Sequence, residues 1–292
     1  MNTRNINFPS NKVHDIEKTF MEQLSALYLG GETRQFVNML FESFMGWDLK
    51  DILLNRNSTI DQSTLLKFHW ALEDLKLMRP IQHIIGYSTF CDCRIEVNSE
   101  VLIPRPETEE IVIRTIAQLQ KTNLTILDVC TGSGCIAIGL AKRIPDARVW
   151  AVDISESALG IAKSNAVQNN VDIQFCQVDI LHELEKLPSE QFDLIISNPP
   201  YIRTSEASVM HSNVLDYEPH LALFVDDSDP LVFYARIAEY AKNHLAPGGL
   251  LVFEINEFLA FETNQMLQTK GFETKGYPDF REKERSIVAW KK

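Results

Sequence analysis

The sequence lacks the cysteine arrangement of a disulfide framework or a zinc site. Five cysteines occur in 292 residues, an odd number, with no C-x-x-C pair and no histidines at zinc-ligand spacing. It also lacks a run of 18 apolar residues, and residues 1–10 do not form the continuous apolar stretch of a secretion signal. We therefore expect a cytoplasmic protein with free thiols, no bound metal and no membrane association.

Positive charge is scarce as well. Lys and Arg number 28 against 40 Asp and Glu, a net charge of −12. Residues 1–85 carry 9 basic and 10 acidic side chains, whereas residues 86–292 carry 19 and 30. An acidic surface repels the phosphate backbone of nucleic acids, so we expect no direct nucleic-acid partner. The hydrophobic fraction of 45% is ordinary for a folded chain.

Residues 11–78 follow a helical pattern. The clearest stretch, Ser63 to Met78, has apolar side chains at the 3-4-3 spacing of one helical face: Leu65, Phe68, Leu72 and Leu75. Val13–Leu29 and Thr33–Phe44 show similar periodicity, and Gly30-Gly31 is expected to end the first of them and turn the chain.

A different pattern begins after this helical stretch. Tyr87–Phe90 and Arg94–Val97 alternate apolar and polar side chains around a candidate turn at Cys91 to Cys93, which predicts a hairpin. The predicted division is a helical domain over residues 1–80, a β-hairpin linker over residues 81–106 and a catalytic domain over residues 107–292.

From Thr125 onward, short β-branched runs alternate with longer helical patterns, which is typical of a sheet wrapped by helices. The expected strands are Thr125–Val129, Arg148–Val152, Ile173–Gln177, Phe192–Ser197, Leu250–Ile255 and Ser286–Trp290. The fold class predicted is α/β, a Rossmann-like sheet with a small N-terminal α-helical domain.

The first expected strand leads into a glycine-rich turn, Cys130-Thr131-Gly132-Ser133-Gly134, and then a helical run. Gly132 and Gly134 let a ligand approach the backbone, and the helix N-terminus presents unpaired N–H groups. Asp153 ends the next strand, where a carboxylate can accept both hydroxyls of a ribose. A nucleotide-type cofactor is predicted; the same pattern also fits NAD, and the glycines could serve a tight turn alone.

Three further residues belong to this end of the sheet. The Asp128 carboxylate could face the positive end of a bound ligand. Asp179, which follows the third strand, suits an adenine amine, and Ile180 suits the face of its ring. The alternative for Asp179 is an N-cap for a helix over residues 180–187.

The fourth strand runs into Asn198-Pro199-Pro200-Tyr201. The prolines fix φ and remove two backbone donors. The Asn198 side-chain oxygen and the Pro199 carbonyl could each accept one N–H of a planar amino group, which aims the nitrogen lone pair along one line. Tyr201 could stack on such a substrate. The alternative is a purely structural Pro-Pro turn with an Asn cap.

The glycine turn, Asp153 and Asn198 to Tyr201 together resemble a class I S-adenosylmethionine-dependent methyltransferase acting on planar amino groups. Within that class, Ile103-Pro-Arg-Pro-Glu-Thr-Glu109 and the helical N-terminus resemble the PrmC/HemK family, the peptide chain release factor N(5)-glutamine methyltransferases. Leu215–Pro219 and Asp279–Arg285 are similar to further segments of that family.

The resemblance implies methyl transfer to the glutamine amide in the Gly-Gly-Gln loop of release factors, with the helical domain recognising that protein. It implies S-adenosylmethionine as cofactor, and Asn198, Pro199 and Tyr201 as catalytic residues. The cofactor would be held by Asp128, Cys130, Thr131, Gly132, Ser133, Gly134, Asp153, Asp179, Ile180 and Asn198, and the substrate by Asn198, Pro199, Pro200, Tyr201, Arg105 and Glu107. The family usually has glycine where Cys130 stands.

Three other functions fit parts of the sequence. A DNA or ribosomal-RNA amino methyltransferase would hold its base amine with the same motif, but the charge opposes it. A non-catalytic scaffold that binds a translation partner would not need Asn198 to Tyr201 intact. An NAD-dependent dehydrogenase would need an acid–base residue near the fourth strand, and none is identifiable there.

Overall fold

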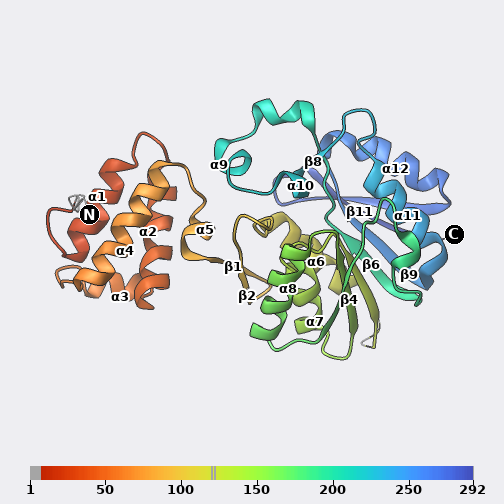
Figure 1. The fold of residues 1–292 in the computed structure, drawn as a ribbon, viewed down its shortest axis with the longest axis horizontal. Coiled ribbons are helices and arrows are strands. Elements are labelled where there is room, and N and C mark those ends of the chain that lie inside the picture. The colour runs from red at the N-terminus through yellow and green to blue at the C-terminus, as the bar shows by residue number, and fades with distance from the viewer. Residues whose placement is uncertain (1–7, 120, 122, 292) are drawn as a thin grey trace. The chain divides into compact units, whose positions relative to one another are not determined.

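The computed structural model describes residues 8–119, 121 and 123–291. Contacts divide the described chain into two compact units. One runs up to Gly86 and includes Ser212–Tyr217; the other comprises Tyr87–His211 and the chain from Glu218 onward (Figure 1). The domain limits expected from the sequence stay a prediction. Among the described residues, no helix is both long enough and apolar enough to cross a membrane.

The first unit is a helical bundle built on aromatic packing. Its helices are α1 (Val13–Gln23), α2 (Gly30–Met45), α3 (Leu49–Leu54), α4 (Gln62–Lys76) and α5 (Ile81–Ile85), with α9 (Ser212–Leu215) from the later segment. The ring of Phe68 lies 4.6 Å from that of Phe41 and 6.3 Å from that of Phe20, centroid to centroid. The Tyr217 hydroxyl donates to the Leu77 carbonyl at 2.8 Å, which ties the later segment to the end of α4.

Side-chain caps set the starts of two of these helices. Asp48 and Asp51 form a reciprocal capping box at α3, and the Asp61 carboxylate accepts from the backbone N–H of Thr64 at the start of α4. The expectation that Gly30-Gly31 separates two helices is wrong. The first helix ends earlier, at Gln23, and the two glycines are the first residues of α2, where side chains are not yet needed for packing.

The predicted hairpin is confirmed. Strands β1 (Tyr87–Phe90) and β2 (Cys93–Glu96) pair antiparallel. Between them, Cys91 and Asp92 have φ of 51° and 63°, the left-handed pair that matches the twist of a two-residue hairpin. Asn165 of the second unit anchors β2, because its side chain accepts from the Glu96 N–H at 2.7 Å and donates to the Glu96 carbonyl at 3.1 Å.

Seven described strands of the second unit form one sheet in the order β10-β11-β9-β6-β3-β4-β5. Their bounds are β3 (Thr125–Val129), β4 (Arg148–Asp153), β5 (Ile173–Gln177), β6 (Phe192–Ser197), β9 (Leu245–Glu254), β10 (Phe272–Pro278) and β11 (Glu284–Lys291). The strands β3, β4, β5, β6 and β9 are parallel, and β11 pairs antiparallel with β9 and β10. All six expected strands are present, although β9 begins five residues earlier and ends one residue earlier, and β10 was not expected.

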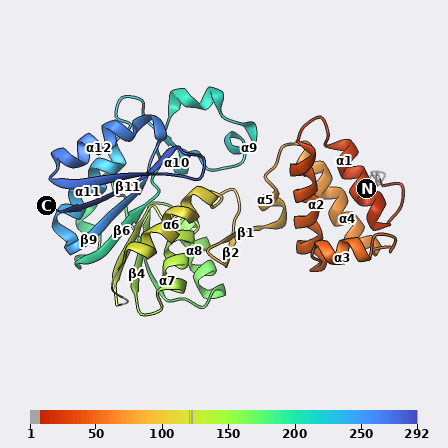
Figure 2. The ribbon, with the colours of Figure 1, turned by 180° about the vertical axis from the view of Figure 1, so that it is seen from behind.

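Helices cover both faces of this sheet (Figures 1 and 2). They are α6 (Pro106–Gln118), α7 (Cys135–Arg143), α8 (Glu156–Gln168), α11 (Val232–His244) and α12 (Ala260–Thr269). The unit also contains a short helix, α10 (His220–Leu223), and a short strand pair, β7 (Ile202–Arg203) and β8 (Phe224–Val225). Alternate strand residues pack on opposite faces: Ile126 belongs to the core with α6 and α7, and Leu127 to the core with α11. The parallel strands therefore bring their carboxyl ends, and the residues that follow them, to one edge.

Candidate active site

A cavity of about 410 Å³ lies at the carboxyl ends of β3, β4 and β6. The predicted site residues that line it are Arg105, Cys130, Thr131, Gly132, Ser133, Asp153, Asp179, Ile180, Asn198 and Pro200. Asp128, Gly134, Glu107, Pro199 and Tyr201 are not among its lining residues. The cavity thus brings together two parts of the chain that are distant in sequence: the loop before α6 and the residues that follow the parallel strands.

The glycine turn takes the left-handed backbone that its sequence suggests. Gly132 and Gly134 have φ of 53° and 80°, and Cys130 has φ of 60°. This left-handed region disfavours every residue that carries a Cβ, so glycine is the residue that suits it. A Cβ on Gly134 would lie 3.0 Å from the Cβ of Ala162, so the approach of α8 also requires glycine there. Cys130 therefore carries local backbone strain at the cofactor turn, of about 1–3 kcal/mol.

Asp128 lies beneath this turn. It is fully buried, and its carboxylate accepts from the Thr131 hydroxyl at 2.6 Å and from the Ala137 N–H at 3.2 Å. Its second oxygen, Oδ1, has no hydrogen-bond partner among the described residues. Burial raises the pKa of Asp128 to about 7, against the two hydrogen bonds, which lower it. In this arrangement Asp128 shapes the turn from below and does not face the cavity.

We expect Asp128→Asn to remove a pH-dependent loss of stability. The unfolded chain ionises this carboxyl near its ordinary pKa, whereas the folded chain holds the proton up to about pH 7. Between about pH 4 and pH 7 the folded protein therefore binds more protons, and its free energy of unfolding falls as pH rises, by up to about 1.4 kcal/mol per pH unit. Urea unfolding of the variant should lose this part of the slope; parallel pH curves for the two proteins would contradict it.

Asp153 is held across the turn by two backbone donors. Its Oδ2 accepts from the Gly132 N–H at 2.8 Å, and its Oδ1 accepts from the Ser155 N–H at 3.0 Å. Burial raises the pKa of Asp153, and the backbone hydrogen bonds oppose that shift. A carboxylate offers about four acceptor positions. Each Asp153 oxygen can therefore accept one more hydrogen bond, which is the requirement for two neighbouring hydroxyls.

The part of the cavity wall that follows β5 combines apolar surface with one further carboxylate. Val178, Ile180 and Phe233 line it, together with Asp179. The Asp179 Oδ1 accepts from the Leu181 N–H at 2.9 Å, which opens a turn followed by a 3-10 segment, Leu184–Lys186, in place of the α-helix considered from the sequence. An apolar wall with an acceptor at its edge suits an adenine ring and its amine.

The cavity fits S-adenosylmethionine in its chemistry. Ser133 Oγ is buried on its wall and has no partner among the described residues, which leaves a polar atom for a ligand to satisfy. Asp153 offers acceptors for the ribose, and the wall after β5 offers an apolar face. Cavities of this kind, of about 300–1,000 Å³, suit small-molecule cofactors. No cluster of candidate metal ligands occurs among the described residues.

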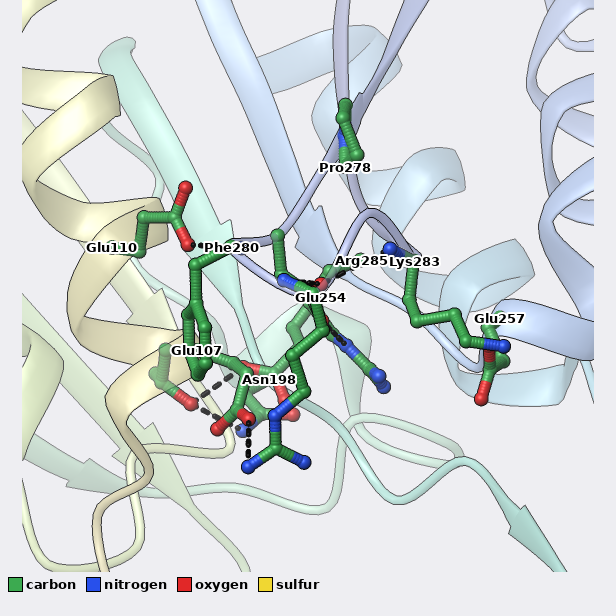
Figure 3. Close-up of polar contacts among 12 residues, drawn as sticks. Glu107, Glu110, Asn198, Glu254, Glu257, Pro278, Phe280, Lys283 and Arg285 are labelled. Atoms are coloured by element: carbon green, nitrogen blue, oxygen red, sulfur yellow. Dashed lines mark hydrogen bonds and ion pairs between the residues drawn. The ribbon is translucent and has the colours of Figure 1, made fainter.

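At the reacting end, Asn198 contacts a buried carboxylate through one hydroxyl. Asn198 Nδ2 lies 3.4 Å from Thr108 Oγ1, and the Thr108 hydroxyl donates to Glu254 Oε2 at 2.6 Å (Figure 3). Thr108 and Glu254 are 3% exposed each. Burial raises the pKa of Glu254, while the hydrogen bonds from Thr108 and Tyr201 and the charge of Arg285 lower it.

Tyr201 points to the same carboxylate. Its hydroxyl donates to Glu254 Oε1 at 3.1 Å, and Asn256 Nδ2 donates to the Tyr201 carbonyl at 3.2 Å. Burial raises the pKa of Tyr201, so the ring stays a neutral phenol that donates. The Asn-Pro-Pro-Tyr loop is thus held from the end of β9, a contact the sequence reasoning did not anticipate.

The loop before α6 is fixed by a buried glutamate. Arg105 Nη2 donates to Glu218 Oε1 at 2.5 Å, and the Ile103 N–H donates to Glu218 Oε2 at 3.0 Å. Glu218 is buried, and the four residues after it, 219–222, line the cavity. This ion pair therefore joins two parts of the cavity wall that are 113 residues apart.

The turn between β10 and β11 reaches the first turn of α6 (Figure 3). The Phe280 N–H donates to Glu110 Oε2 at 3.0 Å, and Arg281 lies 3.8 Å from Glu107. On its other side, Lys283 pairs with Glu257 at 3.0 Å. Glu107 is therefore paired with a surface arginine of this turn and is not among the residues that line the cavity, so its contact with the substrate stays a prediction.

Sequence reasoning missed three residues of the site: Thr108, Glu218 and Glu254. Glu254 carried a usable signal, because a carboxylate directly after the apolar run Leu250–Phe253 ends a predicted strand at the ligand-binding edge. Thr108 and Glu218 lie within segments that resembled a known family, but no local pattern distinguished them from their neighbours.

Two families match this chain. The Methyltransferase small domain family matches residues 90–221, and the PrmC N-terminal domain family matches residues 18–86. Together these two stretches include most of the helical unit, the strand β2, the glycine turn and Asn198 to Tyr201.

Curated relatives match most of the chain. The release factor glutamine methyltransferase of Flavobacterium psychrophilum is 44% identical over 257 residues, which cover 87% of this chain and 90% of the relative. The release factor glutamine methyltransferase of Bacteroides thetaiotaomicron is 38% identical over 247 residues, covering 85% and 88%. A crystal structure of the release factor-specific protein-(glutamine-N5) methyltransferase of Alicyclobacillus acidocaldarius is 27% identical, covers 68% of this chain and 99% of that chain, and has a TM-score of 0.41.

Proposed function

This chain belongs to the release factor glutamine methyltransferase family, and from that membership we propose that it methylates the side-chain amide nitrogen of the glutamine in the Gly-Gly-Gln loop of peptide chain release factors. The methyl donor is S-adenosylmethionine, which supplies a methyl group on a positively charged sulfur. The observation that carries the proposal is Asn198 on the cavity wall beside the cofactor turn.

The proposed cofactor residues are those of the glycine turn and the next two strand ends. Asp153 accepts from the ribose hydroxyls with the oxygen positions that Gly132 and Ser155 leave open. Asp179 accepts from the adenine amine, and Ile180 packs on the ring. Cys130, Thr131 and Ser133 border the remaining part of the cavity.

The proposed amide site consists of Asn198 Oδ1 and the Pro199 carbonyl. Each accepts one N–H of the glutamine side chain, which orients the nitrogen lone pair and stabilises positive charge as it develops on nitrogen. After methyl transfer the positively charged nitrogen loses one of its two protons, so a base of matched pKa is not needed during the transfer itself. Tyr201 is proposed to pack beside the amide plane, with its hydroxyl held on Glu254.

The surface charge of this chain suits a protein substrate better than a nucleic acid. The net charge of −12 repels phosphates. Specific protein complexes typically bury about 1,200–2,000 Å² in total, far more than one glutamine side chain provides. The helical unit offers additional apolar surface, because Leu54, Trp70 and Leu77 are 74%, 49% and 68% exposed. We propose that this unit recognises the release factor, and that the reaction takes place in the cytoplasm.

Labelled methyl transfer tests the proposal. We expect the full chain with labelled S-adenosylmethionine to methylate an intact release factor at the Gly-Gly-Gln glutamine, located by mass spectrometry of peptides. A release factor with that glutamine replaced by alanine is the control and should take up no label. Label in ribosomal RNA or DNA, with none in the release factor, would favour the nucleic-acid methyltransferase instead.

A further inference from the structure

We propose that Thr108 and Glu254 position Asn198, by fixing which way its side-chain amide faces. This inference rests on the proposed function, because it concerns the atom that Asn198 presents to an amide substrate. Asn198 has one accepting oxygen and one donating nitrogen at the same distance from its backbone. Only the oxygen can hold a substrate N–H, so a flipped Asn198 would present two N–H groups to another N–H.

The Thr108 hydroxyl has one proton to donate. Its two candidate acceptors are the Glu254 carboxylate and, if the amide were reversed, the Asn198 side-chain oxygen. The Glu254 carboxylate is 2.6 Å away, whereas the Asn198 side chain is 3.4 Å away, at the long end of the hydrogen-bond range. A carboxylate is also the stronger acceptor, since charge-assisted hydrogen bonds are shorter and about twice as strong as neutral ones. The Thr108 proton therefore lies on the bond to Glu254.

With its proton committed, Thr108 can only accept from Asn198. The Asn198 group facing Thr108 must then be the NH₂ group, and Oδ1 faces the opposite direction. Thr108 and Asn198 both line the cavity, whereas Glu254 is buried and is not among the lining residues. The reversed amide would set Oδ1 against a hydroxyl oxygen with no proton to give, beside the buried Thr108, where unpaired polar atoms are costly.

Two further contacts fix Glu254 itself. The Tyr201 hydroxyl donates to Oε1, and the Tyr234 hydroxyl donates to the Glu254 backbone carbonyl at 3.2 Å. The carboxylate therefore has a donor on each oxygen and a held backbone. Neither Thr108 nor Glu254 is assigned a contact with the reacting atoms, so both act on the reaction through Asn198.

Thr108→Val tests this role, because valine keeps the branched shape and removes the hydroxyl. We expect kcat for release factor methylation to fall by about tenfold to a hundredfold, with the KM for release factor and the affinity for S-adenosylmethionine unchanged. Thr108→Ser, which restores a hydroxyl, should recover most of kcat. Thr115→Val is the matched control: Thr115 is in the same helix, is 2% exposed, and its hydroxyl donates only to the Ile111 carbonyl.

Glu254→Gln provides a second route to the same result. Glutamine can donate to Thr108, which frees the Thr108 proton for Asn198 and removes the orientation preference. We expect a similar loss of kcat, and we expect the Thr108→Val and Glu254→Gln double variant to be no worse than the poorer single variant, as for residues acting in one chain of contacts. Additive losses would overturn the proposal.

A readout independent of turnover separates this inference from the proposed function. In ¹⁵N NMR spectra of the cofactor-free protein, the Asn198 side-chain NH₂ signal should show one hydrogen-bonded proton in the wild type and in Thr108→Ser, and lose it in Thr108→Val. An unchanged signal in Thr108→Val, or a kcat equal to that of Thr115→Val, would overturn the positioning role. A wild-type protein that methylates no release factor would instead overturn the proposed function.

Discussion

Replacement of Asn198 by alanine should lower kcat for release factor methylation by about 10²–10³-fold, a far larger effect than the change in cofactor affinity. Alanine removes the acceptor that stabilises the amide nitrogen as positive charge develops there. It also leaves the Thr108 oxygen without the Asn198 donor. The cofactor residues Asp153 and Asp179 belong to other strand ends and keep their own contacts. The loss should therefore appear in turnover, with little change in the binding of S-adenosylmethionine measured by calorimetry.

Asn169→Ala is the matched control for this change. Asn169 also loses two side-chain hydrogen bonds, to the Arg94 carbonyl at 2.8 Å and the Asn165 carbonyl at 2.9 Å, at the far end of α8. We expect its kcat to stay near the wild-type value. If Asn198→Ala turned over as fast as Asn169→Ala, Asn198 would not hold the reacting amide.

The second large effect concerns Asp153 and the cofactor. Asp153→Asn keeps the shape of the side chain and replaces one accepting oxygen by an NH₂ group. That group cannot accept from both the Gly132 N–H and a ribose hydroxyl, so the turn and the ribose lose a partner together. Hydrogen bonds to a charged group contribute about 1.5–3 kcal/mol. We therefore expect the dissociation constant for S-adenosylmethionine to rise by about tenfold to a hundredfold.

Asp193→Asn is the control, because Asp193 accepts from the Thr125 N–H at 3.0 Å and from Lys121 at 3.2 Å at the other end of the same sheet. This variant shows how much cofactor affinity changes when the protein loses a carboxylate that binds a strand but does not line the cavity. Equal cofactor affinity in the two variants would remove Asp153 from the ribose site. Tight binding of NAD by the wild type, in the same calorimetric experiment, would contradict the cofactor assignment.

The parts of the fold that sequence predicted are those encoded by contiguous residues. Thr125–Val129, the glycine turn and Cys135–Arg143 form a strand, a turn and a helix in sequence, and each has its own local signal. The hairpin was similarly readable, since two alternating runs flank the candidate turn at Cys91 to Cys93, although Cys93 is the first residue of β2 in the structure. Local propensity and hydrophobic period agree with the tertiary structure in all of these elements.

Strand β10 is an element that local sequence patterns do not predict. β10 (Phe272–Pro278) contains glycine and proline and has only one fully buried side chain, so its composition indicates a loop. It is a strand because β11 pairs along its whole length. An edge strand of this kind is determined by its neighbour, which lies outside any local window.

The same limit applies to the site. Asn198 and Asp153 follow predicted strands, so their positions at the ligand-binding edge could be inferred. The hydrogen bond between Thr108 and Glu254 joins residues 146 positions apart, and no spacing rule links them. The sequence thus indicated which groups meet the ligands, whereas the contacts that orient those groups required the fold.

The strand order has a consequence for the synthesis of this protein. Of the seven strands in the described sheet, β11 is synthesised last, yet it is not at the edge: it lies between β9 and β10 and provides the only strand partner of β10 within that sheet. Until the eight residues of β11 are available, β9 keeps an open edge and β10 has no place in the sheet. The turn that joins β10 and β11, with its contacts to the first turn of α6, also forms only then. The nascent chain can therefore complete its parallel strands early, but the contacts of the β10–β11 turn beside Glu254 form only after β11 has been synthesised.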